Sequence, residues 1–181
     1  MKTRRLISMV LFLISAVLFS AALGPAPASA TELYLRGIKW ELGVSVRASA
    51  VRYQPLQAWT QKPGDKLPGR VRFQITVENG SKEEVDGVVV RFALSAKIAP
   101  AAGGEAVWAI PFELGERRIP KLKSSEIRAV PVEPVHLENY LKRLRSQGFW
   151  PEAFKVQVMV DPKAGDNMAS NVVEYTVPVK R

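Results

Sequence analysis

Hydrophobic and polar residues alternate through most of the chain after residue 69. The clearest case is the segment from Arg70 to Glu78, which carries an apolar residue at every second position: Val71, Phe73, Ile75 and Val77. Successive side chains of a β-strand point to opposite faces of its sheet, so this pattern predicts a strand with one buried face. Asn79-Gly80-Ser81 then predicts a turn.

Later segments repeat the alternation. They predict five more strands, at about Val85–Ile98, Ala106–Leu114, Ile127–Val132, Phe154–Val160 and Val173–Val179. Pro111 cannot donate a backbone hydrogen bond and indicates an edge strand or a break in the second of these. Trp108, in the inward phase of the same segment, is predicted to be buried. The last strand is predicted to turn four residues inward: Val173, Tyr175, Val177 and Val179.

The segment from Leu33 to Tyr53 alternates less regularly, because its apolar residues before residue 47 and after residue 50 fall in different phases. A bulge or a switch of strand near Ala48 to Ala50 would join the two phases. The stretch from Pro55 to Pro68 has no period and predicts an extended surface loop.

One segment follows the period of a helix. Between Val135 and Gln147 the apolar residues stand at i, i+3, i+4 and i+7, which is one stripe of an α-helix. They are Leu137, Tyr140, Leu141 and Leu144. The predicted helix covers residues 136–147. The pattern has short strands, one connecting helix and no repeated βαβ alternation. It favours an all-β protein, an antiparallel β-sandwich of seven to eight strands.

The first thirty residues follow the order of a secretory signal peptide, with a positive start and an uncharged apolar run from Leu6 to Leu23. Ala28 and Ala30 are the small residues at which a signal peptidase would cut, ahead of Thr31. An uncleaved membrane anchor is the alternative, because the run is close to the length that spans a bilayer. Thr3-Arg4-Arg5-Leu6-Ile7 partly matches a twin-arginine signal, so the export route stays open. The protein is predicted to be exported, to the periplasm, the cell surface or the medium.

The amino-acid composition excludes several kinds of functional site. The chain has 181 residues, 47% hydrophobic and 24% charged, with no cysteine. Disulfides, thiolate metal sites, cysteine nucleophiles and a lipid-bearing cysteine are therefore excluded. Removal of the first thirty residues takes away three positive charges and no negative ones, so the net charge falls from +9 to +6.

Several strand and turn motifs resemble bacterial immunoglobulin-like domains of the CARDB type. The motifs are Val71-Arg-Phe-Gln-Ile-Thr-Val-Glu-Asn-Gly80, Val88-Val-Val-Arg-Phe-Ala-Leu94, Val156-Gln-Val-Met-Val-Asp-Pro162 and Asn167-Met-Ala-Ser-Asn171. Ile119-Pro-Lys-Leu122 is similar to the linker that precedes a polar turn in that family. The resemblance implies an exported, non-enzymatic immunoglobulin-like domain that serves in adhesion, display or envelope assembly. It divides the chain into a signal peptide (1–30), a segment that joins the sandwich (31–68) and the sandwich itself (69–181).

Candidate chemistry is sparse. His136 is the one histidine, and it has no flanking nucleophile or acid motif, so no catalytic residue and no cofactor is predicted. Asp161, Asp166, Asn167 and Asn171 gather oxygen ligands of the kind that Ca²⁺ binds, but at no EF-hand spacing. We expect these side chains to hydrogen-bond their own turn and predict no metal site.

Two groups of residues offer binding chemistry. Trp59 in the long loop and Trp150 after the helix are the tryptophans predicted to be free to stack on a sugar. The basic residues that anionic polysaccharide or lipid headgroups would contact are Arg117, Arg118, Lys121, Lys123, Lys142, Arg143 and Arg145. No aromatic residues interleave with them, so no nucleic-acid binding is predicted.

The sequence therefore predicts a non-catalytic module that docks on envelope or cell-surface proteins through loops, an edge strand or the helix. Pairing along an edge strand uses backbone hydrogen bonds and needs no distinctive side chains. The stretch from Leu33 to Tyr53 is the better candidate, since Pro178 weakens the last strand. The alternative is a domain that binds carbohydrates or anionic glycans.

Overall fold

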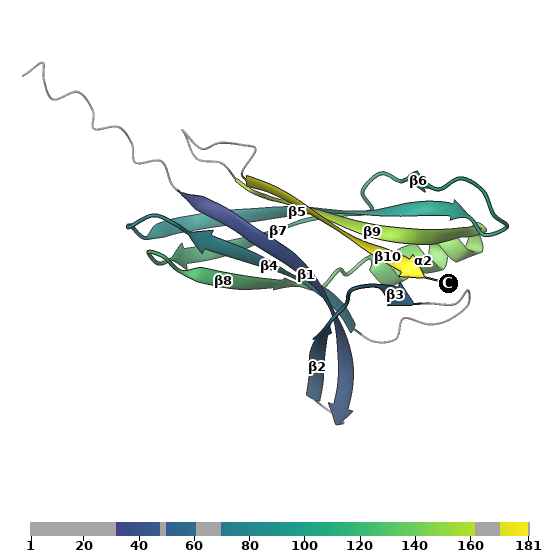
Figure 1. Cartoon of the computed structure of the whole chain (residues 1–181), viewed down its shortest axis with the longest axis horizontal. Coiled ribbons are helices and arrows are strands. Elements are labelled where there is room, and N and C mark those ends of the chain that lie inside the picture. The colour runs from purple at the N-terminus through teal and green to yellow at the C-terminus, as the bar shows by residue number, and fades with distance from the viewer. Residues whose placement is uncertain (1–31, 48–49, 61–69, 162–170, 181) are drawn as a thin grey trace, which may run out of the picture. The chain divides into compact units, whose positions relative to one another are not determined.

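The computed structural model describes residues 32–47, 50–60, 70–161 and 171–180, and these form two β-sheets (Figure 1). The first sheet has the strand order β2-β1-β4-β8, with every neighbouring pair antiparallel. Its strands are β1 (Leu33–Arg47), β2 (Ala50–Pro55), β4 (Arg70–Asn79) and β8 (Ile127–Val132).

The second sheet has the order β3-β10-β9-β5-β6, and β7 also pairs with β5. Its strands are β3 (Trp59–Thr60), β5 (Val85–Pro100), β6 (Val107–Trp108), β7 (Glu113–Leu122), β9 (Phe149–Val160) and β10 (Val172–Lys180). Because β9 occupies one edge of β5, β6 and β7 share the other edge. The pairs are antiparallel except the short pair of β3 with β10.

The two sheets pack face to face around an aromatic core. Trp40 of β1 lies 5.4 Å from Phe73 of β4, ring centroid to centroid, and Phe73 lies 5.3 Å from Phe92 of β5 in the other sheet. All three rings are buried. Burial of one such side chain stabilises the fold by about 1.5–3 kcal/mol, so this row of rings is a main attachment between the layers.

The predicted fold class is confirmed: the protein is an all-β, immunoglobulin-like sandwich with a short helix, α2 (Leu137–Ser146). The strands predicted at 70–78, 85–98 and 127–132 are present within one or two residues of their predicted ends. The helix also forms, and its buried side chains are the predicted stripe residues Leu137, Leu141 and Leu144. The strand predicted from 154 begins earlier, at Phe149.

The segment Ala106–Leu114 does not form one continuous strand, which agrees with the break that Pro111 indicated as one of two alternatives. Only Val107 and Trp108 pair with β5, and the chain then leaves the sheet until β7 begins at Glu113. Of the alternate residues predicted to face inward, Trp108, Ile110 and Leu114 are exposed, whereas Phe112 is half-buried against Tyr140 of α2.

Strand β7 was not predicted. Residues 119–122, expected to form a linker, are its last part and pair with the start of β5.

In the last strand, β10, the predicted burial of Val177 and Val179 is confirmed, whereas Tyr175 is exposed. In the first sheet, the phase change before Tyr53 separates two strands, β1 and β2, and their register shifts between Ser45 and Arg47. Residues 48 and 49 lie outside the described residues.

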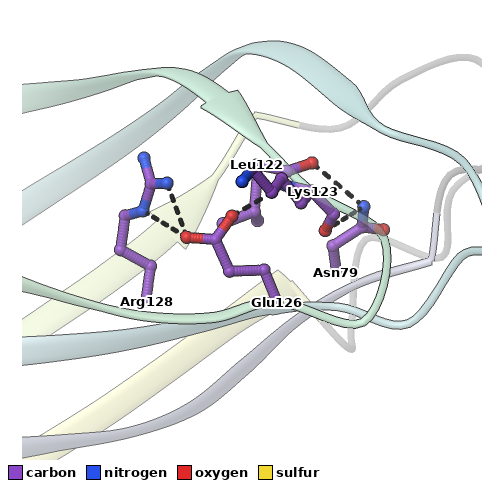
Figure 2. Close-up of polar contacts among 5 residues, drawn as sticks. All are labelled: Asn79, Leu122, Lys123, Glu126 and Arg128. Carbon is purple, nitrogen blue, oxygen red and sulfur yellow. Dashed lines mark hydrogen bonds and ion pairs between the residues drawn. The ribbon is translucent and has the colours of Figure 1, made fainter.

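Asn79 joins two turns that are far apart in the sequence (Figure 2). Its buried amide nitrogen Nδ2 donates to the carbonyl oxygens of Glu83 (2.7 Å), Leu122 (3.2 Å) and Lys123 (3.0 Å). Its Oδ1 accepts from the backbone N–H (3.0 Å) and the hydroxyl (2.6 Å) of Ser81. The turn after β4 is therefore fastened to the turn after β7 through one side chain.

Glu126 completes this corner. Its carboxylate accepts the backbone N–H of Lys123 (2.8 Å) and the guanidinium of Arg128 (2.9 and 2.5 Å). These bonds favour the charged form, so first the Lys123 N–H and then Arg128 lower the pKa of Glu126 below its ordinary value.

Candidate functional site

The β1–β2 hairpin extends beyond the sandwich. The last residue of β1 that pairs with β4 is Gly43, opposite Arg70. From Val44 onward, β1 pairs with β2 alone. Figure 1 shows β2 and the end of β1 pointing away from the two sheets. Among the described residues, this part of β1 has β2 as its only partner strand.

The apolar phase of β1 continues into this extension. Ile38 and Trp40 are buried in the core. Val44, four residues after Trp40 on the same face of β1, is 41% exposed. On the opposite face, Val51 of β2 is 36% exposed. An isolated hairpin with exposed apolar residues on both faces is suited to contact with another surface.

Strand β2 also ends its sheet. Its outer edge has no partner strand among the residues that the structure describes. Backbone N–H and C=O groups along such an edge are free to pair with a strand of another chain. Of the residues of β2, Tyr53 alone is partly buried and the others are exposed.

The base of the hairpin is rigidly attached. Arg72 of β4 donates to the Glu41 carboxylate at 2.6 Å, and its guanidinium lies 3.4 Å from the centre of the Tyr53 ring. The Tyr53 hydroxyl donates to Glu133 at 2.9 Å. Partial burial, followed by the bond to Glu133, raises the pKa of the Tyr53 phenol. Residues from β1, β2, β4 and the end of β8 thus hold the hairpin in one orientation.

Gly43 stands where the hairpin leaves the sandwich. A Cβ atom at this position would lie 2.7 Å from Cγ1 of Val51 and 3.1 Å from the carbonyl oxygen of Arg70. Three strands approach closely at this point because the residue has no side chain.

The predicted exposure of the tryptophans is wrong. Trp59 and Trp150 are 1% and 4% exposed, whereas Trp108 is 42% exposed. Trp59 is covered because β3 pairs with β10 at Val179 and its ring packs 5.3 Å from that of Phe154. Neither buried ring presents a face to a ligand.

The predicted anion-contact residues lie on different elements. Arg117, Arg118 and Lys121 belong to β7, Lys123 to the turn after it, and Lys142, Arg143 and Arg145 to α2. Arg118 pairs with Glu116, Lys121 with Glu84 and Lys142 with Glu138. These seven cations are thus divided among β7, the turn after it and α2, and Arg143 lines a pocket beside the helix.

His136 is exposed at the N-terminus of α2, and its backbone N–H is bound by Glu113. Asp161 pairs with Arg91 at 3.0 Å, and Asn171 is buried. Asp166 and Asn167 lie outside the described residues. Within the described ranges no three His, Cys, Asp or Glu side chains stand close enough together to hold a metal ion.

The predicted signal peptide, with Ala28, Ala30 and Thr31 at its cleavage site, lies outside the described residues. In the described part of the chain, no helix has the length and hydropathy needed to cross a membrane.

Comparisons with known proteins give structural likeness alone. Neither a protein-family model nor a curated protein matches the sequence. One similar solved structure is a CARDB domain from Pyrococcus furiosus in complex with di-metal ions, 12% identical, with a TM-score of 0.43 over 85% of this chain and 97% of that chain. It is the domain type that the sequence motifs resemble.

A second similar structure is a β-glucosidase from Erythrobacter marinus, 16% identical, with a TM-score of 0.35. The likeness covers 80% of this chain and 15% of the glucosidase. At these identities and TM-scores neither likeness carries an argument about function. The sandwich fold of this protein rests on its own strand pairing.

Proposed function

We propose that the protein is an exported, non-catalytic binding module that docks on an envelope or cell-surface protein through the β1–β2 hairpin. The observation that carries this proposal is the extension of the hairpin beyond β4, with a free strand edge and exposed Val44 and Val51. Export rests on the sequence of residues 1–30.

The hairpin suits docking because its base is fixed before binding. Arg72, Glu41, Tyr53 and Glu133 hold the orientation of both strands. A preorganised edge loses little conformational freedom when a partner strand pairs with it, so more of the contact energy appears as affinity. The alternative of sugar binding has less support, because the tryptophans on which it depended are buried.

Capture from the native envelope with a matched pair of variants tests the proposal. Val44→Lys places a charge on the extension, and Ile127→Lys places the same charge on β8, at the other edge of the same sheet, where Ile127 is 62% exposed. Tagged wild-type and variant proteins would be crosslinked to their native envelope, washed at high salt and analysed by mass spectrometry.

We expect wild type and Ile127→Lys to retain the same one or two stoichiometric proteins, and Val44→Lys to lose them while unfolding at an unchanged temperature. Equal retention by all three proteins would refute docking through the hairpin. Retention of lipid or polysaccharide alone, released by salt, would instead support an electrostatic function of the basic residues.

A further inference from the structure

The segment 109–112, between β6 and β7, is held beside α2 in a defined position. The backbone N–H of Ala109 donates to Ala96 (2.9 Å) and that of Phe112 donates to Leu94 (2.9 Å), both carbonyls of β5. The Phe112 ring stacks on Tyr140 of α2, with centroids 4.0 Å apart and planes 10° apart.

Glu113 fixes the helix from the same side. Glu113 is 6% exposed, and its carboxylate accepts hydrogen bonds from the backbone N–H groups of Val135 (3.1 Å) and His136 (3.0 Å). The first residues of a helix have unpaired N–H groups, and a carboxylate there stabilises the helix end. A residue of β7 thus holds α2 next to segment 109–112.

A pocket of about 510 Å³ lies between these two walls. One wall is segment 109–112, and the other is the helix face His136, Asn139, Tyr140 and Arg143, which stand at i, i+3, i+4 and i+7. This volume falls in the range of pockets that take small organic molecules. Both walls are attached to the sandwich by the bonds described above, so the pocket exists before any ligand arrives.

The chemistry of the pocket combines an apolar wall with one cation. Ile110 is 86% exposed, which is unusual for a large aliphatic side chain, and Tyr140 lines the same pocket. None of the described residues that line the pocket is acidic. The neighbouring Lys142 pairs with Glu138 at 2.9 Å, whereas the guanidinium of Arg143 has no ion pair within the described residues.

We propose that this pocket binds a soluble organic carboxylate with an aromatic or branched apolar group. The carboxylate pairs with the Arg143 guanidinium, whose planar N–H groups match a carboxylate in a bidentate geometry. The apolar group packs against Ile110 and the Tyr140 ring. This site is separate from the β1–β2 hairpin, and the proposal does not depend on the proposed function.

Two probes of similar shape test the role of the charge. We would titrate 4-phenylbutyrate and the neutral 4-phenylbutanol into the folded protein at pH 7.5 and follow backbone amide signals by NMR. Phenylbutyrate is expected to shift the amides of 109–112 and 136–143 saturably, and to bind more tightly than the alcohol.

Arg143→Gln and Lys142→Gln are a matched pair, because they remove the same charge from neighbouring exposed positions of α2. A charge-assisted hydrogen bond contributes enough that Arg143→Gln should weaken phenylbutyrate binding roughly tenfold or more and leave phenylbutanol binding unchanged. Lys142→Gln should bind both probes as wild type does. An Ile110→Ser variant should bind both probes more weakly.

Three results would overturn the proposal. The first is an absence of saturable binding at millimolar probe, and the second is equal weakening by Arg143→Gln and Lys142→Gln. The third is binding to phosphatidylglycerol vesicles that depends on Arg143 while phenylbutyrate does not bind, which would make this face a membrane contact instead.

Discussion

Replacement of Asn79 by alanine is expected to destabilise the protein strongly. Asn79 is fully buried and takes part in five hydrogen bonds, three as donor and two as acceptor. Each bond contributes about 0.5–1.5 kcal/mol net, and water can replace the two bonds to the part-exposed Ser81 more easily than the bond to the buried Leu122 carbonyl. We therefore expect Asn79→Ala to lower the free energy of unfolding by about 3 kcal/mol.

Urea unfolding followed by tryptophan fluorescence measures this change. In a domain of this size 1 kcal/mol corresponds to roughly 2–4 °C, so the melting temperature should fall by roughly 6–12 °C. The dependence of the free energy on urea should stay unchanged, since the same surface is exposed on unfolding. Ser81→Ala, which removes one hydroxyl of the same corner, should cost about 1 kcal/mol.

Asn79→Asp separates the hydrogen bonds from the shape of the side chain. Aspartate fills the same volume as asparagine. However, it places a carboxylate oxygen against the three carbonyl oxygens that accept hydrogen bonds from Nδ2 in the wild type. It should destabilise the protein at least as much as alanine does. The reasoning is refuted if Asn79→Ala costs less than about 1 kcal/mol, or if Asn79→Asp is as stable as wild type.

Three further predictions follow from single contacts. Gly115→Ala should cost about 1–3 kcal/mol in urea unfolding, because a Cβ there would lie 2.4 Å from the Phe92 ring, and an unchanged midpoint would show that the ring moves freely. The lowered pKa of Glu126 means that the unfolded chain binds its proton more readily, so this carboxylate stabilises the fold above its ordinary pKa of 4.5 and loses that effect as the pH falls. Wild type should therefore lose more stability than Glu126→Gln between pH 6 and pH 3, and parallel curves would contradict the assignment. Glu113→Ala should raise hydrogen exchange in the first turn of α2 and leave exchange in β4 unchanged, whereas equal exchange in both proteins would show that the helix needs no such cap.

Elements whose pattern is local can be predicted from the sequence. In β4 the alternate apolar residues from Val71 to Val77 are buried, and in α2 the apolar stripe is the buried face. Alternation and helical period depend on residues a few positions apart, so they can be read from the chain directly. The two-layer fold class follows from the number and spacing of such strands.

Whether an apolar face of a segment is buried depends on the tertiary fold. Residues 106–114 alternate as regularly as a strand, yet Ile110 is exposed while Phe112, in the same phase, packs against Tyr140 of α2. Trp59 stands in an aperiodic segment and is buried because β10, over a hundred residues later, pairs beside it. Burial of a side chain depends on which strand or helix packs against its segment. Alternation within the segment does not predict that neighbour.

The same reason applies to the candidate sites. The polar turn at Asn79 was evident from the sequence, but its bonds to the turn after β7 were not, since they span more than 40 residues. The irregular stretch before residue 53 was predicted, whereas its extension beyond β4 appears once the register of three strands is known. Arg143 was one of seven basic residues in the sequence, and the path of segment 109–112 alone places it in a pocket with Ile110, because each wall is held by bonds to a strand distant in the chain.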